Sequence, residues 1–76
     1  MMTKEEYIQE LEFVLETEDG ELSPETELKY LDGWDSTGQL GMVALLDRLG
    51  AMATVTDIRA CQTVADLIRL AGDAVQ

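Results

Sequence analysis

Hydrophobic residues recur at helical spacing in the first part of the chain. Between Thr3 and residue 16, apolar residues return every three or four positions, and mainly acidic residues fill the positions between them. This period predicts an amphipathic helix with one buried stripe. Thr3 and Glu6 have the spacing of a capping box, which starts a helix. The stripe consists of Tyr7, Ile8, Leu11, Val14 and Leu15. Phe13 falls outside it, and we expect it to pack under the following loop.

Residues 17–35 show no sustained period. Asp19-Gly20 and Ser23-Pro24 are turn signals. A loop of this length is uncommon in a compact domain and is often functional. It needs apolar anchors in the core, for which the candidates are Leu22, Leu28, Leu31 and Trp34.

A second predicted helix opens at Asp35 or Ser36 and runs to about Leu49, with Gly50 as its C-cap. Gly38 and Gly41 weaken this helix by about 1 kcal/mol each relative to alanine. The side that we expect to face the core carries Met42, Leu45, Leu46 and Leu49.

Two further helical segments follow. Residues 56–60 form one turn after a Thr56 cap, and Thr63 caps a final helix with Asp66 in its third position. The buried stripe of that helix is Val64, Leu67, Ile68, Ala71 and Val75. The pattern predicts one domain over residues 1–76, an all-α bundle of three long helices and one short helix, with a long loop between the first two.

The charge balance narrows the choice of partners. Sixteen acidic residues against five basic ones give a net charge of −11. Phosphate binding needs a basic surface, so nucleic acid is not an expected partner, and an anionic membrane repels the chain. No apolar run reaches the roughly 20 residues of a membrane span, so no membrane insertion is expected. The electrostatic field of this negative charge instead steers the protein toward basic patches on other proteins.

The N-terminus is polar, without an apolar signal region, and Cys61 is the only cysteine. We therefore expect a cytoplasmic, reducing environment and a monomer. No histidine is present, which removes the commonest general base and metal ligand. No catalytic or metal-binding residue is predicted: a Gly-x-Ser-x-Gly hydrolase elbow is absent, zinc ligands are too few, and neither Gly20 nor Gly33 has calcium-loop ligands at the required spacing.

The most informative segment is Gly33-Trp34-Asp35-Ser36-Thr37. It resembles the attachment motif of acyl and peptidyl carrier proteins, an Asp-Ser-Leu at the start of the second helix. The long loop before the motif agrees with this family. So do the residues at its usually apolar positions, Leu40, Met42, Val43 and Leu46, and the final-helix opening at residues 63–68. The resemblance covers essentially the whole chain.

The resemblance implies a carrier and not an enzyme. A phosphopantetheinyl transferase would attach 4'-phosphopantetheine from coenzyme A to Ser36, and Asp35 would assist by helping to position the metal and the serine. A helix N-terminus tolerates the phosphate that results. The thiol of the arm would carry an acyl, aminoacyl or polyketide cargo as a thioester. The implied partners are the transferase, a loading enzyme and a downstream synthase or transferase.

Several positions depart from the family pattern. Thr37 replaces the usual leucine, and Gly41 and Arg48 stand where carriers of fatty acid synthesis commonly have acidic residues. Asp47 keeps the expected charge. These departures favour a specialised carrier in a polyketide, nonribosomal-peptide or surface-modification pathway. Partner recognition would involve Thr37, Leu40, Ala44 and Asp47.

Two interpretations remain open for Leu40 and Ala44. They form either an apolar landing surface for partner enzymes or a half-buried part of the core. Ser36 is likewise either the attachment site or an ordinary helix cap. The alternative function is an acidic helical adaptor or inhibitor that binds a basic protein surface.

Overall fold

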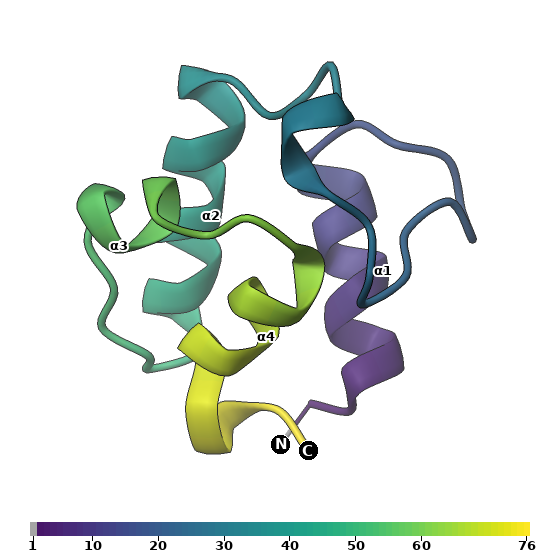
Figure 1. The fold of residues 1–76 in the computed structure, drawn as a ribbon. Helices are drawn as coiled ribbons and strands as arrows, with labels where there is room; N and C mark the ends of the chain where they lie inside the picture. Colours follow the sequence, from purple (N-terminus) through teal and green to yellow (C-terminus); the bar gives the residue numbers. More distant parts are fainter. Residues whose placement is uncertain (1) are drawn as a thin grey trace.

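The computed structural model describes residues 2–76 and confirms the all-α prediction (Figure 1). The helices are α1 (Lys4–Val14), α2 (Ser36–Arg48), α3 (Val55–Arg59) and α4 (Val64–Ala71). Two single 3-10 turns, η1 (Leu28–Tyr30) and η2 (Gly72–Ala74), complete the regular structure. Residues 2–76 contain no strand, only two isolated bridges. None of their helices has the length and apolar character that crossing a membrane would require.

The core lies where the apolar stripes of α1, α2 and α4 meet. From α1 and its C-cap Leu15, the side chains of Tyr7, Leu11 and Leu15 are fully buried, while Ile8 and Val14 lie half-buried at the edge. The Tyr7 hydroxyl donates a hydrogen bond to the Leu67 carbonyl at 2.9 Å, which ties α1 to α4. The rest of the buried core is Leu22, Leu28, Met42, Leu45, Leu46, Ile58, Val64, Leu67, Ala71 and Val75.

The prediction for Phe13 is wrong, because its side chain is 82% exposed. The path of the loop explains the difference. The chain turns away from α1 at Glu16, whose φ is 57°, and the Leu22 N–H then donates to the Glu12 carboxylate at 3.1 Å. The loop therefore covers the face of α1 that carries Glu12, and it leaves Phe13 in solvent.

The predicted caps of α1 and α4 are confirmed as capping boxes, formed by Thr3 with Glu6 and by Thr63 with Asp66. The predicted cap of α3 is wrong by two residues. Thr54 is the N-cap, and its box partner is Asp57. The third position after Thr56 is Arg59, which has no acceptor to complete a box, so the local hydrogen bonds favour the earlier start.

The long loop is held by both apolar anchors and backbone hydrogen bonds. Leu22 and Leu28 are buried, and Leu31 and Trp34 pack half-buried against the core. The loop also pairs with the segment before α4, because Leu28 N donates to the Gln62 carbonyl at 2.9 Å. Two further bonds, Val64 N to the Thr26 carbonyl and Ala65 N to the Pro24 carbonyl, extend this contact. The loop thus delivers the chain to the start of α2 along a defined path.

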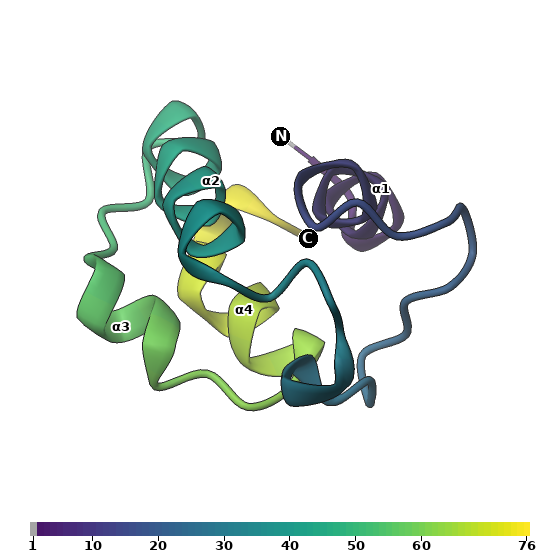
Figure 2. The same ribbon diagram turned by 90° about the horizontal axis from the view of Figure 1, so that it is seen from above.

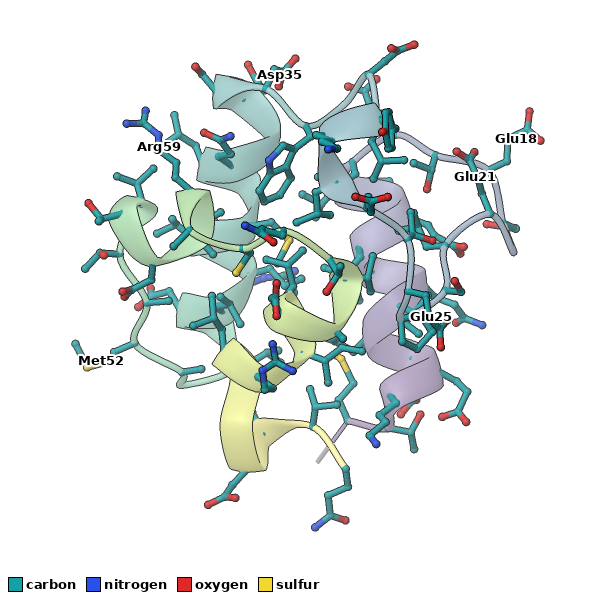
Figure 3. All side chains as sticks on the ribbon, in the orientation of Figure 1. Glu18, Glu21, Glu25, Asp35, Met52 and Arg59 are labelled. Carbon is teal, nitrogen blue, oxygen red and sulfur yellow. The ribbon has the colours of Figure 1, made fainter. Side chains whose placement is uncertain are left out.

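The first and last of the described residues meet at one end of the bundle (Figure 1), where Gln76 N donates to the Met2 carbonyl at 2.9 Å. Asp35, before α2, lies at the opposite end (Figure 3). Seen from above, α2 and α3 lie next to each other, and α4 lies between α3 and α1 (Figure 2). The start of α2 is therefore free of both chain ends.

Candidate functional site

Asp35 caps α2, and Ser36 is the first residue of the helix. The Asp35 carboxylate accepts a hydrogen bond from the Gly38 N–H at 2.9 Å, and its backbone is extended (φ −128°, ψ −172°). The interpretation of Ser36 as the helix cap is therefore wrong. Ser36 is exposed at the first helical position, and its hydroxyl is not needed to satisfy the helix end.

Glycines hold the start of α2 directly against the end of α1. A Cβ atom on Gly33 would overlap the Leu15 carbonyl, and one on Gly38 would overlap the Gly33 carbonyl. One turn further on, a Cβ on Gly41 would lie 2.8 Å from the Val14 Cγ1 atom. Gly38, which weakens an isolated helix, thus permits a close approach of backbones, and Gly41 leaves space for the Val14 side chain. This contact fixes the position of Asp35 and Ser36.

An apolar groove lies on the exposed side of α2, one turn beyond Ser36. Leu40 is 62% exposed and Ala44 is exposed, so the interpretation of these two residues as half-buried core is wrong. Val43 and Asp47 extend the same side of α2, and the groove has a volume of about 320 Å³. Ser36 and Leu40 are four residues apart, which places them on the same side of the helix.

The other wall of this groove comes from the segment between α2 and α3. Met52, Ala53 and Thr54 line it, and Met52 is 95% exposed. Figure 3 shows Met52 at the outer edge of the molecule on the α3 side. The sequence pattern does not single out these residues, because they lie outside any periodic segment. A large apolar residue in a short loop was the only signal that could have drawn attention to Met52.

Thr37 and Asp47 differ in their relation to the groove. Both side chains are exposed on α2. Asp47 lines the groove at the end far from Ser36, whereas Thr37 follows Ser36 directly and is not among the groove residues. The structure therefore brings Leu40, Ala44 and Asp47 together, with Thr37 outside this set.

A cationic residue also lies near the start of α2. Arg59, in the last turn of α3, donates from Nε to the Gln39 side-chain oxygen at 3.3 Å. Gln39 is one turn after Ser36, and Figure 3 shows Arg59 near the Asp35 end of α2. Within residues 2–76 the ion pairs are Lys29–Glu27 and Arg69–Asp66, so Arg59 has no acidic partner there. The sequence did not reveal this pairing because it depends on the packing of α3 against α2.

Cys61 is the other residue with nucleophilic chemistry. It is half-buried, and burial raises the pKa of its thiol, with the Arg69 charge opposing this shift and the Asp57 charge adding to it. Its Sγ donates to the Asp57 carbonyl at 3.5 Å. A thiol with a raised pKa is a poor nucleophile at neutral pH. In the described part of the chain, no three His, Cys, Asp or Glu side chains are grouped as metal ligands.

The residues around Ser36 fit a covalent phosphopantetheine group. The hydroxyl is exposed at a helix N-terminus, where partial positive charge favours a phosphate. Arg59 adds a positive charge nearby, and the apolar groove follows along the helix. Comparisons of the chain with protein-family models, with curated proteins and with solved structures found no match. The functional interpretation therefore depends on the residues and geometry of this chain and on the resemblance of its motif to the carrier family.

Proposed function

We propose that the protein is an acyl carrier protein whose Ser36 bears a 4'-phosphopantetheine arm. The observation that carries this proposal is that Asp35 and Ser36 have different roles at the start of α2. Asp35 provides the cap, and Ser36 presents an exposed hydroxyl that the fold does not use. The Asp-Ser pair and the long anchored loop before it, which resemble the carrier family, support the same function.

In the attachment step, the Ser36 hydroxyl oxygen forms a bond to the coenzyme A phosphorus that is nearer the pantetheine. The P–O bond to the bridging pyrophosphate oxygen breaks, adenosine bisphosphate leaves, and the hydroxyl proton passes to a base of the transferase. Asp35 lies next to Ser36 and can bind the metal ion of the transferase through the carboxylate oxygen that does not cap α2. Once attached, the arm supplies a thiol on which cargo is held as a thioester.

Partner enzymes would bind along the exposed side of α2. Leu40, Ala44 and Met52 offer an apolar contact area that begins one turn beyond Ser36, and Asp47 adds a negative charge at the far end. Exposed apolar groups of this kind mark interaction surfaces when they gather in one place. Thr37, next to Ser36, supplies a smaller and more polar contact than leucine. This difference at Thr37, together with Gly41 and Arg48 at usually acidic positions, is the reason to propose dedicated partners in a specialised pathway.

The test is the intact mass after incubation with coenzyme A, Mg²⁺ and a broad-specificity phosphopantetheinyl transferase. We expect the wild type to gain one phosphopantetheine and Ser36→Ala to gain none. Because Asp35 provides the cap, Ser36→Ala should keep the wild-type melting temperature, which separates loss of the attachment site from loss of the fold. A folded wild type that stays unmodified by an active transferase would instead support the acidic adaptor or inhibitor.

A further inference from the structure

A second groove lies between α1 and the long loop. Its volume is about 520 Å³, and its lining includes Ile8 and Glu12 from α1 and Leu22 from the loop. Glu5 and Asp19 stand at its sides and are exposed. The groove therefore combines an aliphatic floor with a negatively charged rim. None of its residues takes part in the proposed carrier site.

Glu12 is the unusual residue of this groove, because its side chain is buried to all but 3% of its surface. One carboxylate oxygen, Oε2, accepts the hydrogen bond from Leu22 N. No hydrogen bond within residues 2–76 reaches the other oxygen, Oε1, and neither ion pair of these residues involves Glu12. This oxygen is not enclosed, since the fully buried side-chain polar atom without a hydrogen-bond partner in residues 2–76 is the Thr17 hydroxyl oxygen. Oε1 is therefore open to the groove, where it can accept a hydrogen bond from a positively charged group outside the chain.

We propose that this groove, which we call the Glu12 groove, binds a lysine or arginine side chain from a basic segment of a partner protein. The lining of the groove matches these side chains along their length, from the apolar stem to the charged head. Their methylene stems would pack on Ile8 and Leu22, and the charged head would reach the Glu12 carboxylate. Glu5 and Asp19 add attraction at the rim. A short, flat apolar ligand would leave Glu12 unpaired, and a small cation would leave the aliphatic floor uncovered.

The long-range field supports a protein as the occupant. The net charge of −11 steers basic surfaces toward the molecule, and Figure 3 shows Glu18, Glu21 and Glu25 on the same loop that forms the groove. The same figure places this loop and Met52 on opposite sides of the molecule. A partner in the Glu12 groove would therefore leave the α2 surface open. This inference does not rest on the modification of Ser36.

The test uses the unmodified full chain, labelled with ¹⁵N, and two short blocked peptides at low ionic strength. One peptide has a single arginine between two leucines, and the control peptide has glutamine in place of the arginine. We expect the arginine peptide to shift the backbone amide signals of Ile8, Glu12, Gly20 and Leu22 in a saturable way. The glutamine peptide should bind about tenfold more weakly or not at all.

Variants make the assignment specific. Glu12→Gln keeps an oxygen that can accept the hydrogen bond from Leu22 N, but it removes the negative charge. This variant should keep the fold and bind the arginine peptide about tenfold more weakly. The double variant Glu5→Gln, Asp19→Asn should weaken binding by a smaller factor. The matched control Glu25→Gln, Asp73→Asn removes two charges outside the groove lining and should retain most of the binding.

Three outcomes would overturn the proposal. Equal binding of both peptides would show an apolar groove without charge recognition. Unchanged affinity of a folded Glu12→Gln variant for the arginine peptide would show that the Glu12 carboxylate takes no part in recognition. A dimer of the free protein that the peptide dissociates would assign the groove to a second copy of this chain.

Discussion

The Asp35 carboxylate accepts a hydrogen bond from the Gly38 backbone N–H at 2.9 Å, and this contact brackets Ser36 within the first turn of α2. Gly38 is also held from outside the helix, because it lies against the Gly33 carbonyl. The exposed hydroxyl of Ser36 is thus presented on a turn whose backbone is fixed on both sides.

Asp35 serves both the helix cap and the proposed attachment step, and two substitutions separate these roles. Asp35→Ala removes the cap and should cost about 1 kcal/mol of unfolding free energy. Asparagine caps about as well as aspartate, so Asp35→Asn should keep the stability but lose the negative charge. We expect its rate of phosphopantetheinylation to fall by about tenfold or more. Urea unfolding and the initial rate of mass gain measure the two effects, and a normal rate in Asp35→Asn would reduce Asp35 to a cap.

Gly38 should resist a substitution that usually stabilises helices. In an exposed helix interior, glycine to alanine gains about 1 kcal/mol. Here the new methyl group would meet the Gly33 carbonyl oxygen and the Leu15 Cδ2 atom, so we expect a net loss of about 1–3 kcal/mol. Gly41→Ala is the control, since its methyl group meets only the Val14 side chain, which can shift. Urea unfolding followed by circular dichroism should place Gly41→Ala at or above the wild type in stability and Gly38→Ala below it, and a stabilised Gly38→Ala would refute the close contact.

Leu40 and Phe13 are both exposed apolar residues on helices, but only Leu40 lines the groove beside Ser36. Leu40→Glu and Phe13→Glu should both leave the circular dichroism spectrum and melting temperature nearly unchanged, because neither side chain is buried. Leu40→Glu should lower the kcat/KM of the transferase by about tenfold, and Phe13→Glu should not. Equal effects of the two variants would point to general charge repulsion and away from a docking surface.

The buried hydroxyl of Tyr7 should make the stability of the protein depend on pH in the alkaline range. Its side chain is fully buried, and burial raises the pKa of its hydroxyl well above the ordinary value of about 10. Below about pH 10 the hydroxyl is protonated in both the folded and the unfolded state, so its contribution is complete. Above that pH the unfolded state loses the proton first, and the free energy of unfolding should fall as the pH rises further.

Chemical denaturation between pH 8 and 11.5 (roughly, spanning the ordinary tyrosine pKa) tests this dependence. The raised pKa of Cys61 acts in the same direction at lower pH, so the variants are best compared in a Cys61→Ala background. Tyr7→Phe should be less stable at pH 8 by about 1 kcal/mol, since the Leu67 carbonyl loses its hydrogen bond, and its alkaline slope should be smaller. Tyr30→Phe, at an exposed position, should keep the slope. An unchanged slope in Tyr7→Phe would contradict the burial argument.

The sequence by itself determined the helices and most of their ends. The capping boxes of Thr3 with Glu6 and Thr63 with Asp66 are local, because each involves residues three positions apart. The buried stripes of α1, α2 and α4 follow in the same way from the helical period. The period is a property of the backbone, so it can be read without knowing what packs against the helix. The Asp35-Ser36 motif at the start of α2 belongs to this group.

The tertiary structure decided which side of each helix is covered and which segments meet. Glu12 is buried and Phe13 is exposed because the loop turns at Glu16 and crosses one face of α1 and not the other. Met52 joins Leu40 in one groove, and Arg59 reaches Gln39, only because α3 packs beside α2. The contacts of Glu12 with Leu22 and of Gln39 with Arg59 join residues 10 and 20 positions apart through the path of a loop, and helical periodicity contains no information about that path.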